Sequence, residues 1–501
     1  MDEMLSALHN ALGAIGVGSR EEPQSTDGVD SESGWLVDVD MELEATQRGL
    51  NTRFVCPQKG RKYEEQAQAV PISDGVFLPV LASRPPGASI DLAVVAMHGK
   101  PRDYEEYFRK TLVAINEQPG CGAFRSSCRI LSIVPVFPDE PCTAHAWSGG
   151  SSKVEAPIWS TAGKVQQWAY GGFSDPGSSS NGTGLGGIPS FAAYDAVLEW
   201  VTNAYPTVRA VVASGYSAGG QMIQRWSVLS AEGAYGVTRL GVPLRIVVGA
   251  PSSVLYLDST RPAQRCSPEK NTGPHHVCTS FSVPKENCNG YDEYGHGLGN
   301  IQGSWASAKG SVTSGASTYL FSSLSSAGDW QSALLDRFAT KNIRYFVGEL
   351  DTVSCIVGAC DGSCASMLTG SNRLQRLQNF VSYLQQVFGP GKPQHLSLIP
   401  GTVHVGGGLP MMQMELPEWV AWSNSLQVSW YCKESATKLS HYPVCDKSCE
   451  GGSAICCSSP ARSSEHEAGS RCLVGDGYQV DDALCGEPPA LCEIDRGPYD
   501  G

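Results

Sequence analysis

Short apolar runs alternate with helical segments along the middle of the chain. The runs lie at residues 76–81, 92–97, 130–137, 210–213, 244–248, 343–347 and 395–399, and the helical segments at 194–204, 219–229 and 374–388. The run at 92–97 (LAVVAM) has no polar residue, which is typical of a strand buried on both faces. Strands that alternate with helices predict a mostly parallel sheet covered by helices on both sides. The sequence therefore predicts an α/β fold.

A G-x-S-x-G motif lies where one of these runs meets a helical segment. The sequence Gly215-Tyr216-Ser217-Ala218-Gly219 follows the run at residues 208–213 and opens the segment at 219–229. A serine in a sharp strand-to-helix turn has strained backbone angles, and side chains on its neighbours would collide, so the glycines have a steric role. We interpret Ser217 as a nucleophile, and an ordinary Gly/Ser turn before a helix is the alternative.

An acid and a histidine follow the last two predicted strands. Asp351 lies just past the run at 343–347, and His404 lies in the loop beyond the run at 395–399. The carboxyl ends of such strands are where open α/β sheets carry functional groups. We predict that Asp351 orients the imidazole of His404, which removes the proton from Ser217. Glu349 and Asp361 are nearby alternatives for the acid.

The strand at 92–97 is followed directly by His98-Gly99. We predict an oxyanion hole formed by the amide of Ala218 and that of Gly99 or Lys100, because glycine lets the backbone approach a substrate closely. Losing one such donor typically costs about 3 kcal/mol of transition-state stabilisation. We expect His98 to shape this loop and His404 to be the base.

Several neighbouring side chains are candidates for substrate contact. They are His98, Arg102, Tyr104, Tyr216 and Trp147. Arg102 and Tyr104 follow the proposed oxyanion loop, and they either contact the substrate or only fix the loop. Trp147, Trp159 and Trp168 either line an apolar or sugar-binding site or belong to the core, which is the commoner role of large aromatic residues.

The domain organisation follows from changes in composition. We expect an acidic N-terminal extension at residues 1–70, with an edge strand at 35–43, and a large α/β domain at 71–431. Insertions at 138–190 and 252–330 are too long for ordinary loops, so we expect them to form a cap or the walls of a site. Residues 432–501 hold eight cysteines and few aliphatic residues, which predicts an appendage held together by disulfides.

The 18 cysteines indicate an oxidising compartment, because cytosolic thiols are kept reduced. We therefore expect a secreted protein, although the start at Met1 lacks the basic residues and unbroken apolar run of a typical signal peptide. The sequon at Asn181 permits N-glycosylation. No run reaches the roughly 18 apolar residues of a membrane span.

Charge and spacing argue against several partners. A net charge of -14 repels phosphate backbones and anionic lipid, so we expect no nucleic-acid or membrane-surface partner. Cys355, Cys360 and Cys364 beside Asp361, and His275-His276 among further cysteines, lack the paired spacing of common zinc sites, so disulfides are favoured. The Gly-rich stretch at 171–187 lacks the lysine and helix of a phosphate loop. We expect neither a metal nor a cofactor.

These residues resemble the α/β-hydrolase superfamily over roughly residues 75–430. The resemblance rests on His98-Gly99, the motif around Ser217, Asp351 and His404, which occur in the order nucleophile, acid, histidine. It implies an eight-stranded, mostly parallel sheet and hydrolysis of an ester, amide or thioester through an acyl-enzyme. Segments at 250–258 and 370–373 resemble poorly characterised extracellular-type hydrolases. The chain departs from a minimal hydrolase in its cysteine-rich tail and in the long, cysteine-bearing gap between acid and histidine.

Three functions fit this pattern. The first is a carboxylic-ester hydrolase that acts on a small molecule or a polymer. The second is a serine peptidase of the same fold, because both reactions pass through the same tetrahedral oxyanion. The third is a non-catalytic binding or adhesion module. The complete Ser217, Asp351 and His404 set argues against the third, while the cysteine-rich tail is a candidate for carbohydrate or protein contact.

Overall fold

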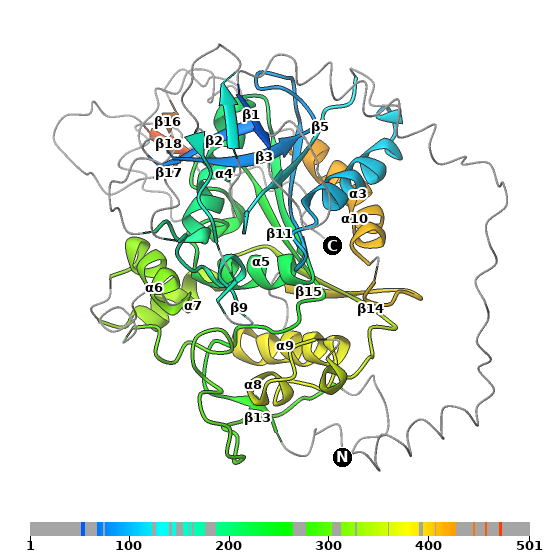
Figure 1. Ribbon diagram of the computed structural model, residues 1–501. Coiled ribbons are helices and arrows are strands. Elements are labelled where there is room, and N and C mark those ends of the chain that lie inside the picture. The colour runs from blue at the N-terminus through cyan, green and yellow to red at the C-terminus, as the bar shows by residue number, and fades with distance from the viewer. Residues whose placement is uncertain are drawn as a thin grey trace. The chain divides into compact units, whose positions relative to one another are not determined.

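In the computed structural model of the chain, the seven apolar runs and one strand that was not predicted, Gln68–Ser73, pair into one eight-stranded sheet (Figure 1). In spatial order the strands are β15 (Gln394–Ile399), β14 (Ile343–Gly348), β11 (Leu244–Gly249), β10 (Ala210–Tyr216), β4 (Leu92–Met97), β5 (Ile130–Pro135), β3 (Val76–Ala82) and β2 (Gln68–Ser73). The six strands from β15 to β5 are parallel. β3 pairs with β5 in antiparallel orientation, and β2 pairs with β3 in antiparallel orientation at the edge of the sheet. The prediction of a mostly parallel α/β sheet is confirmed.

The structure describes most of residues 68–426 and four short strands outside that range. The gaps within the range are 74–75, 123–126, 140–142, 147–153, 160, 163–164, 176–186, 264–276, 303–311, 326–327, 359, 390–393 and 406. The outlying strands are β1 (Thr52–Val55), β16 (Val444–Cys445), β17 (Cys456–Cys457) and β18 (Ser470–Cys472). The edge strand predicted at 35–43, Asn181 and most of the cysteine-rich tail lie outside the described residues, so the predicted domain limits stay predictions.

The three predicted helices are present as α4 (Ser190–Ala204), α5 (Ala218–Leu229) and α9 (Arg373–Phe388). Further helices were not predicted: α3 (Tyr104–Asn116), α6 (Val312–Ser323), α7 (Trp330–Ala339), α8 (Cys364–Met367) and α10 (Gly408–Ser425). α10 contains Pro417, which argues locally against a helix, but its buried face packs on the sheet and compensates.

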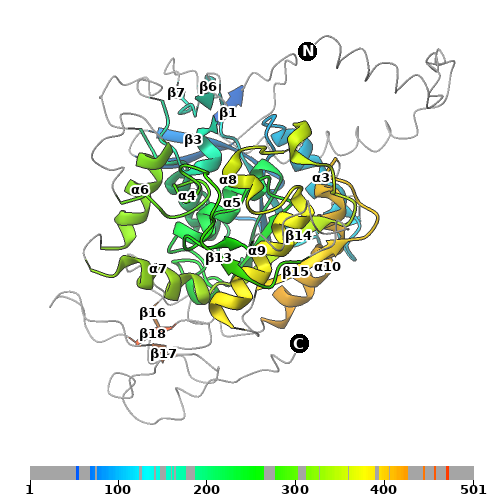
Figure 2. The same ribbon diagram turned by 90° about the horizontal axis from the view of Figure 1, so that it is seen from below.

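Helices cover the sheet from both sides. α3 and α10 contact each other as well as β4, and they lie together beside the sheet in Figures 1 and 2. α5 packs on β10 and β11, and it contacts α6 and α7, which lie away from α3 and α10 in both views. α9 packs on β14 and β15. The strands β4, β5, β10 and β11 are buried along their whole length, as their apolar sequences require.

The two expected insertions contain short elements of their own. The first carries β6 (Thr143–Ala146), β7 (Val154–Glu155), β8 (Thr161–Ala162), β9 (Val165–Gln166) and the short helix η2 (Gln167–Tyr170). β6 pairs with both β7 and β1, so the three form a small sheet. The second carries the two-stranded sheet β12 (Arg261–Pro262) and β13 (Phe281–Ser282), followed by α6.

Three disulfides lie within the described residues: Cys121–Cys128, Cys288–Cys364 and Cys355–Cys360. The preference for disulfides over a metal at Cys355, Cys360 and Cys364 is therefore confirmed, and the bonds fit an oxidising compartment. None of the helices in the described part of the chain has the length and apolar character needed to cross a membrane.

The first turn of α5 packs directly on the backbone of the neighbouring strands. A Cβ at Gly219 would lie 2.4 Å from the carbonyl oxygen of Met97 in β4, and one at Gly220 would lie 2.2 Å from that of Gly249 in β11. Real Cβ atoms essentially never approach so closely, and a carbonyl in a buried strand cannot move aside. The two glycines therefore allow the helix to begin directly above the sheet.

We expect Gly220→Ala to destabilise the protein. The clash with Gly249 should cost about 1–3 kcal/mol, which exceeds the gain of about 1 kcal/mol from the better helix propensity of alanine. Gly122→Ala is the matched control, because a Cβ there meets nothing closer than 3.9 Å. Denaturant unfolding measures both variants, and equal stability of the two would contradict this account of the packing.

Candidate active site

Ser217 occupies a strained turn between β10 and α5. Its φ of 60° and ψ of -119° lie in a region that side-chain-bearing residues rarely adopt. The Ser217 amide donates to the Gly249 carbonyl (2.9 Å), which ties the turn to β11. A Cβ at Gly215 would lie 2.4 Å from the carbonyl oxygen of Gly219. The glycines on either side thus let the turn close, as the motif predicts.

The structure brings Ser217, His404 and Asp351 together in one hydrogen-bonded chain. Ser217 Oγ lies 2.9 Å from His404 Nε2, and His404 Nδ1 lies 2.9 Å from Asp351 Oδ2. With the ring proton on Nδ1, His404 donates to the carboxylate and accepts from the hydroxyl. This tautomer is the one a general base needs. The ring of Tyr216 stacks on that of His404, with centroids 5.3 Å apart.

Asp351 is buried and faces a cation. Its side chain is 1% exposed, and Arg373 Nη1 lies 3.6 Å from Oδ1, the oxygen that does not face His404. Arg373 is the first residue of α9, and the next amide, that of Leu374, donates to the Asp351 carbonyl (3.3 Å). The positive end of the helix dipole and the guanidinium both stabilise the carboxylate anion. Sequence reasoning missed Arg373.

The alternative acids have other partners. Glu349 Oε2 accepts from the Gly401 amide (3.2 Å), and Asp361 accepts from the Ser366 hydroxyl (2.7 Å). Among the described carboxylates, Asp351 is the one hydrogen-bonded to His404.

The loop after β4 is fixed by hydrogen bonds of its own. His98 is fully buried, its Nδ1 lies 3.0 Å from the Gly99 carbonyl oxygen, and its Nε2 accepts from the Phe137 amide (3.4 Å). Burial lowers the pKa of His98 from 6.5 to about 3, so this ring is neutral. The Gly99 amide donates to Asp103 Oδ1 (2.8 Å). His98 therefore shapes the loop, as expected, and the Gly99 amide has an internal partner.

The remaining predicted contact residues are mostly buried. Arg102 is 5% exposed, has a φ of 58°, forms an ion pair with Asp139 (2.6 Å) and donates to the Trp159 carbonyl (2.5 Å). It thus fixes the loop. Tyr104 is buried, as are Trp159 and Trp168, which matches the core interpretation of these aromatic residues. Lys100 is exposed. Trp147 lies outside the described residues.

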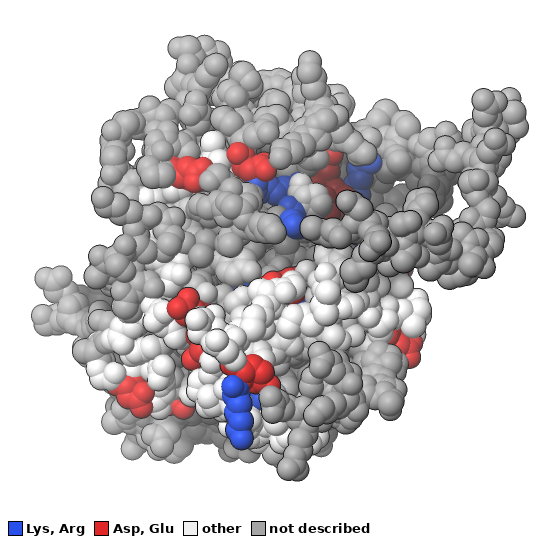
Figure 3. Space-filling view, turned by 60° about the horizontal axis from the view of Figure 1, so that its bottom comes forward, with Lys and Arg blue, Asp and Glu red and all other residues white. Residues whose placement is uncertain are grey.

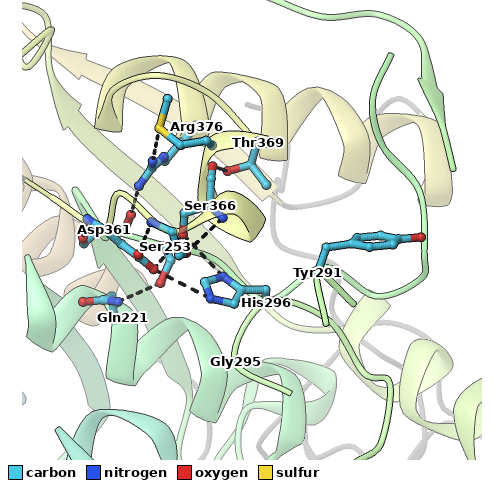
Figure 4. A network of polar contacts seen from close by, with 12 residues as sticks. Gln221, Ser253, Tyr291, Gly295, His296, Asp361, Ser366, Thr369 and Arg376 are labelled. Atoms are coloured by element: carbon cyan, nitrogen blue, oxygen red, sulfur yellow. Dashed lines mark hydrogen bonds and ion pairs between the residues drawn. The ribbon is translucent and has the colours of Figure 1, made fainter. Parts of the chain in front are cut away.

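A second polar cluster lies beside the first turns of α5 (Figure 4). His296 contacts Ser366 through Nδ1 (3.4 Å) and Asp361 through Nε2 (3.7 Å). Gln221, one helical turn after Ser217, donates to Ser253 (2.8 Å), whereas the labelled Tyr291 points away in Figure 4. The cluster joins both insertion and core segments, which is why no local sequence pattern indicated it. Ser366 is 1% exposed, whereas His296 and Asp361 are partly exposed.

We expect His296 to make stability depend on pH. Burial lowers its pKa from 6.5 to about 4, while Asp361 opposes the shift and Arg225, Arg261 and Arg376 reinforce it. Between these pH values the unfolded chain binds a proton that the folded chain does not, so the free energy of unfolding falls as pH drops from about 6.5 to about 4.

His296→Gln should remove this part of the pH dependence, which amounts to about 2 kcal/mol. Denaturant unfolding at pH 7, 5.5 and 4.5 measures the difference from the wild type. His395→Gln, at an exposed position, is the control. Parallel stability curves for wild type and His296→Gln would rule out the shifted titration.

Comparisons with known proteins find only distant structural likenesses. Neither a protein-family model nor a curated protein matches the sequence. Solved structures that are similar include LpqC, a poly(3-hydroxybutyrate) depolymerase from Bordetella parapertussis (17% identity, 72% of this chain and 94% of that chain, TM-score 0.41). Another is poly(aspartic acid) hydrolase-1 from Sphingomonas sp. KT-1 (14% identity, 68% of this chain and 93% of that chain, TM-score 0.37). A third is the Pyrococcus furiosus esterase Pf2001 (12% identity, 74% of this chain and 97% of that chain, TM-score 0.29). In the large sheet, the turn at Ser217 follows β10, which is the fifth of the eight strands in chain order. By this topology the chain has the α/β-hydrolase fold.

Proposed function

We propose that this protein is a serine hydrolase that cleaves a carboxylic ester through an acyl-enzyme. The observation that carries the proposal is the hydrogen-bonded chain from Asp351 through His404 to Ser217. A hydroxyl is a weak nucleophile until an adjacent base takes its proton. The strained turn and the two 2.9 Å contacts supply that base in the required orientation.

In the first step, Ser217 Oγ attacks the ester carbonyl while His404 Nε2 takes its proton. Asp351 stabilises the imidazolium that forms. The oxyanion develops beside the Ala218 amide, which lies in the first turn of α5 and has no acceptor within the helix. Because the Gly99 amide donates to Asp103, we assign the second donor to Lys100 rather than to Gly99.

In the second step, His404 gives the proton to the leaving alcohol and the carbon–oxygen bond of the ester breaks. This leaves the acyl group on Ser217. A water molecule then loses a proton to His404 and attacks the acyl carbonyl. The bond between the acyl carbon and Ser217 Oγ breaks, His404 returns the proton to Oγ, and the acid is released. No step needs a metal or cofactor.

Two features favour an ester over a peptide, and catalysis over binding. The large insertions within the domain, at 138–190 and 252–330, favour an ester. A complete triad also argues against a module that only binds. We further propose secretion, in keeping with the three disulfides, and a binding role for the cysteine-rich tail.

A fluorophosphonate probe and p-nitrophenyl esters test this proposal. The wild type should label and turn over esters, and Ser217→Ala should abolish labelling and lower kcat by about 10⁴-fold or more. Ser322→Ala, which removes a hydroxyl bonded only within α6, should behave like the wild type. A folded wild type that does not label would overturn the proposal and favour the binding module. Turnover of peptide amides but not esters would favour the peptidase.

We expect Arg373 to be a positioning residue for the triad. In Arg373→Gln, Asp351 loses a neighbouring positive charge, so its negative charge acts more strongly on His404. The acidic limb of the kcat/KM profile should then move to higher pH by roughly one unit, and kcat should fall because the carboxylate is held less firmly. Arg373→Lys should keep the limb near its wild-type position. A profile of unchanged shape with only lower stability would show that Arg373 has a structural role alone.

A further inference from the structure

The loops that carry Asp351 and His404 hold an unusual set of exposed aliphatic side chains. We call this set the apolar rim: Leu350, Val353, Ile356, Val357, Val403 and Val405, which are 49%, 53%, 75%, 74%, 48% and 86% exposed. They are half of the twelve exposed large hydrophobic side chains in the described part of the chain, yet they come from two segments of eight and three residues. Isolated exposed aliphatic residues are normal, but a concentration of them marks an interaction site.

The two loops lie side by side at the triad. The Leu350 amide donates to the Thr402 carbonyl (2.9 Å), next to the bond between Asp351 and His404. Leu350 and Val353 flank the acid in sequence, and Val403 and Val405 flank the histidine. Because His404 contacts Ser217, any ester held at the serine lies next to this rim.

The outermost part of the rim is held rigidly. Ile356 and Val357 lie in the one-turn helix η6 (Cys355–Val357), within the short loop closed by the Cys355–Cys360 disulfide. The Cys355 amide donates to the Ser371 carbonyl (2.8 Å), and beyond the disulfide the Asp361 amide donates to Ser252 Oγ (2.7 Å). Two aliphatic side chains are thus presented to solvent by a loop anchored at both ends, and contact with a ligand would cost little ordering entropy.

The charges around the rim limit what it can bind. Residues 352–360 and 400–414 contain no Lys, Arg, Asp or Glu, and the nearest charged residues along these two segments outside the triad, Glu349 and Asp361, are acidic. The nearby cation Arg373 is buried and faces Asp351. On the face of the molecule seen in Figure 3, the described surface carries few Lys and Arg groups and several scattered Asp and Glu groups. An anionic head group would meet no exposed cation on these two segments and some repulsion. A neutral apolar chain fits both the side chains and the charges.

We propose that the apolar rim binds the aliphatic chain of a neutral, poorly water-soluble ester while its carbonyl reacts at Ser217. The proposal rests on the function proposed above and adds a substrate class to it. Ile356 and Val357 are the specificity-determining contacts, because they are exposed, adjacent and held by the disulfide. We expect the rim to matter mainly for long acyl chains, because Ile356 and Val357 follow Asp351 by five and six residues along its loop.

The test compares p-nitrophenyl acetate with p-nitrophenyl dodecanoate on the full chain. The wild type should have the higher kcat/KM for dodecanoate. The double variant Ile356→Ser/Val357→Ser should lose roughly 10- to 100-fold on dodecanoate and change less than about twofold on acetate. Val283→Ser is the matched control, since Val283 is 56% exposed and follows β13, in a separate sheet. Cys355→Ser/Cys360→Ser should show a smaller loss of the same kind.

The outcomes separate the two proposals. Failure of the wild type to label with a fluorophosphonate and to turn over either ester would overturn the proposed function and the rim with it. Turnover of acetate with no preference for dodecanoate, or a double variant that keeps that preference, would overturn the rim alone. Sedimentation of the same proteins gives a further check: if the double variant converts an oligomer to a monomer and keeps the chain-length preference, the rim is a contact between copies of this chain.

Discussion

The close packing of α5 against the ends of three strands is the constraint on which the site depends. Gly219 and Gly220 bring the first turn of the helix onto the carbonyls of Met97 and Gly249, closer than any side chain would allow. The chain must therefore turn sharply at Ser217, at a φ of 60°, to enter the helix. The burial of β4, β10 and β11 outweighs this strain. The serine hydroxyl is consequently held above the sheet, facing the loops that follow β14 and β15.

Electrostatics divide the buried polar groups into two kinds. Around the triad, Arg373 and the start of α9 place positive charge beside the buried carboxyl group of Asp351, which bonds to His404. Elsewhere, burial keeps histidines neutral, as with His98 and His296, whose pKa values fall to about 3 and about 4. Those two rings act as fixed hydrogen-bonding groups, which leaves His404 as the histidine bonded to the nucleophile.

The disulfides and the second polar cluster support the same side of the site. Cys288–Cys364 links the second insertion to α8, and Cys355–Cys360 closes the loop that presents Ile356 and Val357. His296, Asp361 and Ser366 connect these segments by further polar contacts. The long gap between acid and histidine, which departs from a minimal hydrolase, is thus a cross-linked structure that carries the apolar rim. Cross-links of this kind keep surface loops in one conformation where a small core cannot.

Local sequence determined seven of the eight strands of the sheet, the helices α4, α5 and α9, and the turn at Ser217, because apolar runs, helical periodicity and glycine positions act over a few residues. It also indicated Asp351 and His404, since each follows a recognisable strand. Only the tertiary structure decided that Gly99 donates to Asp103, that Arg373 faces Asp351 and that His296 meets Asp361. It also decided that α10 forms despite Pro417 and that six aliphatic residues stay exposed around the triad. Most of these depend on contacts between residues far apart in the chain, and packing, rather than local preference, selects them.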